Sequence, residues 1–73
     1  MDGVWRLQSQ VQAPGSRIED AAEWFVENWW KPRTPWRWSD KSAGTFEVSG
    51  DLYRVRLGGV EDVWWFIERF ERC

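Results

Sequence analysis

The length of the chain, 73 residues, is the feature that most limits what it can fold into. A domain of this size removes only roughly 60% of its unfolded surface from water, so it needs an efficient core or a stabilising partner. The single Cys excludes an intrachain disulfide, and the absence of His removes the commonest metal ligand. The chain does have eight Trp, four Phe and one Tyr. Because each aromatic side chain buries about 150 to 250 Å², we expect one domain over residues 1–73 with an aromatic core.

The amino-terminal third has the pattern of a strand followed by a helix. Val4 to Val11 alternates, with Trp5, Leu7 and Val11 on one side, which predicts a half-buried strand that Pro14-Gly15 ends. Ser16 and Glu19 have the spacing of a capping box. A helix should then end near Trp30 or Lys31, because Pro32 disfavours helical geometry in the residue before it. The apolar stripe of this helix is Ile18, Ala21, Ala22, Phe25, Val26 and Trp29.

The middle of the chain predicts a three-stranded meander, with strands at 35–39, 45–49 and 52–57. A hairpin loop at Gly50-Asp51 would place Phe46 opposite Val55 and Glu47 opposite Arg54. A loop over residues 40–44 would pair Ser39 with Thr45, Trp38 with Phe46, Arg37 with Glu47 and Trp36 with Val48. Apolar residues then face apolar residues throughout, and a slip of one residue would destroy this agreement.

The last segment has the spacing of a second helix. Gly58-Gly59 ends the preceding strand, and Glu61 and Asp62 suit a first helical turn. The stripe is Val60, Val63, Trp64, Ile67 and Phe70. The expected fold is therefore an α+β two-layer sandwich of order β-α-β-β-β-α, with both helices packed on one face of a small, mainly antiparallel sheet.

The positions of the eight Trp suggest a protein-binding surface. Those at 5, 29, 36, 38 and 64 fall on apolar stripes and are assigned to the core. Trp24 and Trp65 point away from the stripes of their helices, with Trp30 undecided, so we expect an outward Trp patch rimmed by Glu23, Glu27, Glu61 and Arg69. The predicted function is a small protein-protein interaction module, either a homodimer or an adaptor or inhibitor that docks on a larger protein. Small acidic chains of this kind are common among phage and mobile-element products.

Nucleic-acid binding is the alternative. The open sheet face would carry Arg6, Arg37, Arg54 and Arg56, and the basic segment 31–41 adds Lys31 and Arg33. Two observations weigh against it. The alternation turns the meander aromatics inward, although single-strand readers usually expose rings for stacking, and both predicted helices are acidic.

Residue types argue against other functions. Without His there is no base for a Ser or Cys nucleophile, and no metal or cofactor motif is present, so we expect neither an enzyme nor a metal protein. No apolar run is long enough for a membrane span, and the amino terminus lacks the pattern of a signal peptide, which predicts a cytoplasmic protein without membrane contact. Cys73 is assigned no role.

The run from Gly50 to Gly59, Gly-Asp-Leu-Tyr-Arg-Val-Arg-Leu-Gly-Gly, followed by the predicted helix, resembles the second half of a SPOR-type peptidoglycan-binding repeat over about 20 residues. The chain departs from that family in having an extra strand at 36–39 and no final strand. The resemblance implies glycan binding as a remote alternative.

Overall fold

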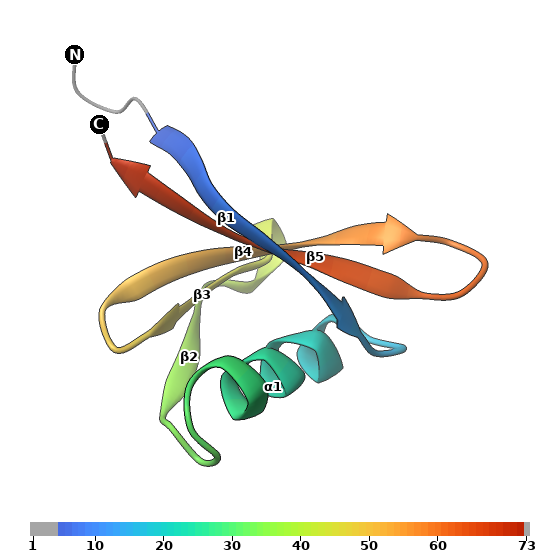
Figure 1. The fold of residues 1–73 in the computed structure, drawn as a ribbon, viewed down its shortest axis with the longest axis horizontal. Helices are drawn as coiled ribbons and strands as arrows, with labels where there is room; N and C mark the ends of the chain where they lie inside the picture. Colours follow the sequence, from blue (N-terminus) through green and yellow to red (C-terminus); the bar gives the residue numbers. More distant parts are fainter. Residues whose placement is uncertain (1–4, 73) are drawn as a thin grey trace.

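A single antiparallel sheet of five strands runs through residues 5–72, the part of the chain that the computed structural model describes (Figure 1). Its spatial order is β1-β5-β4-β3-β2, with β1 at Trp5–Pro14, β5 at Trp64–Arg72, β4 at Asp51–Gly59, β3 at Thr45–Val48 and β2 at Trp36–Asp40. One α-helix, α1 at Ile18–Trp29, packs on one face, and a short 3-10 helix, η1 at Lys41–Ala43, links β2 to β3. The α+β class is confirmed, but the described chain contains one α-helix where two were predicted.

Helix α1 occupies its predicted place, although its first turn is capped by a different acid. The backbone N–H of Arg17 donates to the Asp20 carboxylate at 3.1 Å, and the Ser16 hydroxyl donates to the same oxygen at 3.2 Å. The predicted capping residue, Glu19, is therefore wrong, and the neighbouring residue Asp20 takes that role. The buried face of α1 carries Ala21, Ala22, Phe25 and Val26. Trp29 was assigned to the core with them, but it is 59% exposed at the end of the helix.

The predicted second helix is wrong, because residues 64–72 form strand β5. This strand lies between β1 and β4 and pairs with both of them. Its spacing fits a helical stripe, yet it also alternates, with Trp65, Ile67 and Arg69 on one side and Trp64, Phe66, Glu68 and Phe70 on the other. Aromatic residues favour strands, and here two neighbouring strands satisfy the backbone of β5. Pairing with β1, about 60 residues earlier, is a tertiary effect that local spacing does not reveal.

The meander forms with one change of register. Trp36 pairs with Val48, Arg37 with Glu47 and Trp38 with Phe46, as predicted, and a bulge then places Asp40 rather than Ser39 opposite Thr45. In the next hairpin the turn is Ser49-Gly50 instead of Gly50-Asp51, so Phe46 faces Tyr53 rather than Val55. The error is two residues along β4. Because side chains alternate with a period of two, every predicted face is kept.

The core lies between α1 and the sheet. Phe46 is fully buried, and Trp36 and Trp38 pack edge-on against it with ring centroids 5.6 and 5.8 Å away. Phe25 of α1 reaches the Tyr53 ring at 4.8 Å. Trp36 and Trp38 therefore contribute to the core as predicted, whereas the side chain of Trp5 lies outside the described residues.

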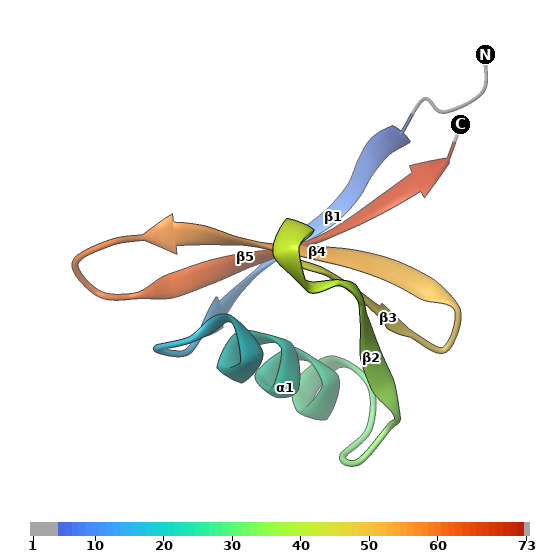
Figure 2. The ribbon, with the colours of Figure 1, turned by 180° about the vertical axis from the view of Figure 1, so that it is seen from behind.

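Within residues 5–72, no helix packs on the other face of the sheet, since α1 lies on one side of the twisted strands in both Figure 1 and Figure 2. Trp64 belongs to this open face, because its ring lies against Gly58 and Gly59 and packs on Phe66 at 4.7 Å. The prediction that Trp64 lies on the apolar stripe of a second helix, in the core, is therefore wrong. A bulge in β1 between Leu7 and Ser9 also turns Leu7 to the open face, opposite Phe70, and away from Val11.

Candidate functional site

The open face of the sheet combines aromatic rings with arginines. Strand β5 contributes Trp64, Phe66, Glu68 and Phe70, and their neighbours on β4, Arg54 and Arg56, lie opposite Glu68 and Phe66. Paired residues of antiparallel strands share one side of the sheet, so these side chains form one layer. Ile67, Val55 and Phe46 fill the opposite side, against α1. The sheet therefore has an aliphatic and aromatic inner face and an arginine-bearing outer face.

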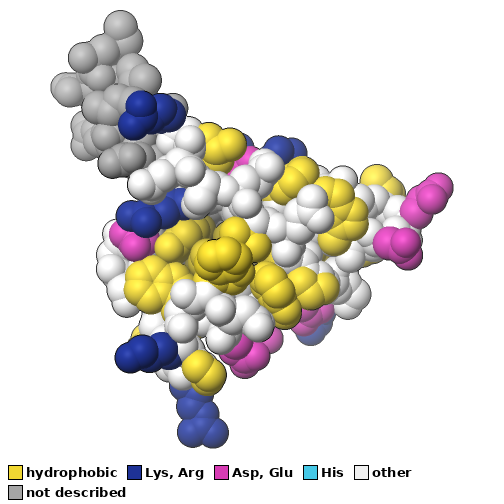
Figure 3. All heavy atoms as spheres, viewed as in Figure 1, with side chains coloured by type: hydrophobic (Ala, Val, Ile, Leu, Met, Phe, Trp, Pro, Cys, Tyr) yellow, Lys and Arg dark blue, Asp and Glu magenta, His cyan; other side chains and the backbone are white. Residues whose placement is uncertain are grey.

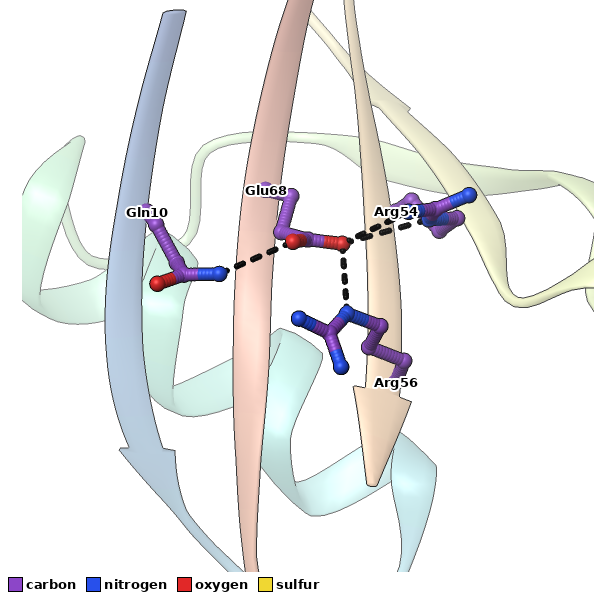
Figure 4. Close-up of polar contacts among 4 residues, drawn as sticks. All are labelled: Gln10, Arg54, Arg56 and Glu68. Carbon is purple, nitrogen blue, oxygen red and sulfur yellow. Dashed lines mark hydrogen bonds and ion pairs between the residues drawn. The ribbon is translucent and has the colours of Figure 1, made fainter. Parts of the chain in front are cut away.

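A carboxylate lies at the centre of this layer, where a surface acid would ordinarily be hydrated (Figure 4). Glu68 is only 2% exposed. Its Oε1 accepts hydrogen bonds from Nη2 of Arg54 at 2.9 Å, from Nε of Arg54 at 3.2 Å and from Nε of Arg56 at 3.0 Å. Its Oε2 accepts from Nε2 of Gln10, on β1, at 2.9 Å. Three adjacent strands thus converge on one buried carboxylate, and we call these four residues the Glu68 cluster.

Each arginine of the cluster also packs on a phenylalanine ring. The guanidinium carbon of Arg54 lies 4.7 Å from the ring centroid of Phe70, and that of Arg56 lies 4.5 Å from the centroid of Phe66. Such contacts contribute about 0.5 to 1 kcal/mol each at exposed positions. The two arginine side chains stay 45% and 48% exposed. Glu68 and the phenylalanine rings therefore hold the two guanidinium groups in place, while the solvent side of each group stays accessible.

The surroundings of Glu68 favour its charged form. Burial by itself would raise the pKa of this carboxyl, but hydrogen bonds from Arg56, Arg54 and Gln10 outweigh it and hold the pKa below its ordinary value. Glu68 is therefore an anion at neutral pH. The cluster as a whole keeps an excess of one positive charge, because two arginines surround one carboxylate.

A shallow apolar hollow of 260 Å³ adjoins the cluster. It is lined by Thr45, Leu52, Tyr53, Arg54 and Phe70. Leu52 is a partly exposed leucine at one wall, and Phe70 is the ring on which Arg54 stacks. The open face thus offers cationic donors and an apolar recess side by side.

The Trp patch predicted on the helix layer does not form. Trp24 and Trp65, the two predicted anchors, are both partly buried against the core, and Trp65 lies on β5 rather than on a helix. Its Nε1–H donates to the carbonyl of Gly15 at 2.8 Å, which ties β5 to the β1–α1 connection. Trp30 is also partly buried. These three rings stabilise the fold and do not make one exposed surface.

The predicted rim is dispersed as well. Glu23 and Glu27 are exposed on α1, whereas Glu61 lies in the turn between β4 and β5. Arg69 lies on β5, where its Nη2 is 3.3 Å from Oδ1 of Asp51. Figure 3 shows acidic side chains at the tip of the β4–β5 turn, far from the helix. Glu23 and Glu27 line one shallow hollow beside Arg33, and Trp30 and Arg69 share another, a helix-side groove of 390 Å³. That groove is lined by Ser9, Gln10, Val11, Phe25, Trp29, Trp30, Asp51, Tyr53 and Arg69.

The residues proposed for nucleic-acid binding lie in three separate places. Arg54 and Arg56 lie together in the Glu68 cluster, and Arg37 is on the same face, 3.8 Å from Glu47. Arg6, predicted on the open face, is on the helix side of β1 instead, because it pairs with Glu71 while its neighbour Leu7 pairs with Phe70 of the open face. Lys31 and Arg33 are exposed in the connection between α1 and β2, where Figure 3 shows basic side chains at the lower end of the molecule. The predicted cross-strand contact of Glu47 with Arg54 is replaced by the contact of Arg54 with Glu68.

Sequence reasoning missed Glu68, Phe66 and Phe70 as members of the open face. The signal was present as the period-2 alternation of residues 64–70, but a helical stripe fitted the same residues. Gln10 was missed as well, because its role as a hydrogen-bond donor to Glu68 requires the pairing of β1 with β5.

No protein-family model matches this chain, and neither the curated proteins nor the solved structures contain a significant match to it. Within residues 5–72, no group of three or more metal-ligating side chains comes together. Over the same residues, no helix has the length and apolar character needed to cross a membrane.

Proposed function

We propose that this chain is a non-enzymatic protein-binding module that docks its partner on the open face of the sheet, at the Glu68 cluster. The observation that carries this proposal is the pair of half-exposed arginines, Arg54 and Arg56, fixed on a buried carboxylate beside aromatic rings. The docking surface is not the helix-layer Trp patch that the sequence pattern favoured.

Preorganisation is the first support. A free arginine side chain loses about 0.5 to 1.5 kcal/mol of conformational freedom when a partner immobilises it. In this fold Glu68 and the rings of Phe66 and Phe70 already hold the two guanidinium groups. Arginine and aromatic residues are also the types that dominate the binding energy of protein interfaces. A partner would therefore bind a surface whose side chains are already ordered and are of the types found in binding hot spots.

The positive charge of Arg54 and Arg56 indicates which chemical groups the partner should carry. The contacts to Glu68 engage Nε of Arg56 and both Nε and Nη2 of Arg54, and a guanidinium carries five N–H donors in all. The remaining donors suit a second carboxylate, supplied by the partner in a charge-assisted contact. The adjoining hollow, beside Leu52 and Phe70, suits an apolar side chain of the partner. We infer that the docking segment carries an Asp or Glu next to an apolar residue.

Selection from a displayed library of random twelve-residue peptides tests this proposal. The expected result is enrichment of peptides with an acidic residue next to an apolar one, and loss of their binding to Arg54→Gln/Arg56→Gln. Arg37→Gln is the matched control, because it removes a positive charge from the same face outside the cluster. Peptides that bind the double variant as tightly as the parent chain would refute docking at the cluster.

Nucleic-acid binding is a second candidate, favoured by one observation. Because residues 64–72 form a strand, Trp64, Phe66 and Phe70 share the open face with the arginines, while the acidic residues of α1 lie on the opposite layer. Both objections drawn from the sequence are thereby weakened. The stacked guanidinium groups, however, already occupy one side of the Phe66 and Phe70 rings.

Fluorescence anisotropy with a labelled single-stranded oligonucleotide separates the two candidates. If a protein partner is the ligand, the chain leaves a twenty-nucleotide probe unbound at moderate salt. Tight binding of the probe that weakens steeply as salt rises, and that Arg54→Gln/Arg56→Gln abolishes, would replace the protein-binding proposal with this one.

A further inference from the structure

The geometry of strand β1 points to a second copy of this chain as its pairing partner, through antiparallel contact of β1 with β1. This inference is independent of the proposed function, because it uses the edge of the sheet and not the open face. Strand β1 spans ten residues and pairs on one side, with β5. Its outer edge presents backbone groups to solvent along the longest strand of the sheet.

The outer edge of β1 lacks the charges that usually protect such strands. Exposed edges in natural sheets are commonly guarded by Lys and other charged residues, by Pro or by bulges. From Leu7 to Pro14 the strand has no charged residue, and Figure 3 shows few charged side chains along the path of β1. Its bulge lies at one end, between Leu7 and Ser9, and Pro14 lies at the other. Residues 9–13 between them pair regularly with β5 and are unguarded.

The opposite edge of the sheet differs in each of these respects. Strand β2 has five residues, two of which are charged, Arg37 and Asp40, and Lys41 follows directly. A bulge between Trp38 and Asp40 disrupts its regular pairing. These charges and this bulge are features that ordinarily protect an edge strand from pairing. The contrast singles out β1 as the edge suited to association.

A second copy fits β1 because a symmetric pairing joins no like charges. Antiparallel self-pairing about Val11 places Val11 opposite its own copy, Gln10 opposite Gln12 of the second copy, and Ser9 opposite Ala13 of the second copy. Val11 and Ala13 both lie on the helix side of the sheet, and Gln10 and Gln12 both lie on the open side. Side chains of matching character therefore meet on each face.

The resulting dimer would present the two open faces together. A two-fold axis perpendicular to the sheet keeps both α1 helices on one side and both Glu68 clusters on the other. The two five-stranded sheets then form one continuous sheet. A partner that carries two docking segments would bind such a dimer with avidity.

Sedimentation of the full chain over about 10 to 300 µM tests the pairing. The expected species has twice the 8.8 kDa mass of the chain. Ser9→Lys/Gln12→Lys adds two positive charges to the edge and should weaken the dimer about tenfold or more while leaving the circular dichroism spectrum unchanged. Val60→Lys/Val63→Lys adds the same charge in the exposed β4–β5 turn and should leave the dimer intact.

A cysteine cross-link tests the register. In a Cys73→Ser background, Val11→Cys should form a disulfide-linked dimer under mild oxidation, whereas Ala43→Cys, in exposed η1, should not. A chain of 8.8 kDa at the highest concentration would overturn the inference. So would a dimer that the Ser9→Lys/Gln12→Lys variant leaves at full strength.

Discussion

Nη2 of Arg54 lies 2.9 Å from Oε1 of Glu68, on the side of the sheet opposite the helix. An antiparallel sheet with one uncovered face ordinarily keeps that face polar and hydrated. Here Glu68 lies between two arginines that pack on the Phe66 and Phe70 rings, and it is as buried as the core residues. This layer of side chains shields Glu68 from solvent, as a second helix packed on this face would do in a larger fold.

Removal of the Glu68 charge should destabilise the fold. In Glu68→Gln the amide oxygen can still accept a hydrogen bond, but the charge-assisted contacts with Arg54 and Arg56 are lost. We expect the free energy of unfolding to fall by about 1 to 3 kcal/mol, measured by urea denaturation. Glu47→Gln is the control, because Glu47 pairs with the exposed Arg37 at 3.8 Å and such surface pairs contribute about 0 to 1 kcal/mol. Equal effects of the two substitutions would contradict the central role of Glu68.

Stability should fall in acid through Glu68. Its pKa in the folded chain lies below the ordinary value of 4.5, so folding favours the charged carboxylate. The resulting stabilisation is present above pH 4.5 and is lost as pH falls through the lowered pKa. We therefore expect the difference in unfolding free energy between the parent chain and Glu68→Gln to shrink below pH 4.5. A difference that stays constant down to pH 2 would show that Glu68 does not titrate with folding.

The Trp65 indole should matter more for stability than the Trp29 indole. Trp65 joins β5 to the carbonyl of Gly15, 50 residues away, through a hydrogen bond of 2.8 Å. Trp65→Phe loses this donor and should cost about 1 kcal/mol or more in urea denaturation. Trp29→Phe alters a ring that is 59% exposed, and its effect should stay within about 0.5 kcal/mol. The opposite ranking would support the helix-layer patch expected from the sequence.

The fold was predictable wherever local pattern and pairing agree. Helix α1 and the β2–β3 register follow from a 3.6-residue stripe and from apolar residues facing one another, and both form within a short stretch of chain. Strand β5 could not be predicted in the same way. Residues 64–70 fit both the helical period of 3.6 and the strand period of two. The choice between helix and strand depends on pairing with β1, a distant strand in the sequence.

The candidate site was predictable only in part, for the same reason. The open-face positions of Arg54 and Arg56 follow from the alternation of β4 alone. Their partner, Glu68, reaches that face only after residues 64–72 become a strand. A helix there would have kept Phe66 and Phe70 away from the arginines, so one error in secondary structure concealed the whole cluster.

The Ser49-Gly50 turn offers a direct test of the β3–β4 register. Both residues have positive φ, 49° and 85°, as a type I′ hairpin turn requires. Asn tolerates this conformation better than Ser, so Ser49→Asn should stabilise the chain by about 0.5 kcal/mol. A Cβ at Gly50 would meet no atom within 4 Å, so Gly50→Ala should cost about 1 kcal/mol through backbone strain alone.

Asp51→Gly distinguishes this turn from the Gly50-Asp51 loop suggested by the sequence. In the observed register Asp51 is the first residue of β4 and contacts Arg69 at 3.3 Å, so its replacement by Gly should destabilise the chain in urea denaturation. If Gly50-Asp51 were the loop, Gly at position 51 would relieve the turn and stabilise the hairpin. Because the two registers predict opposite signs, a stabilising Asp51→Gly together with a neutral Ser49→Asn would establish the register that this structure excludes.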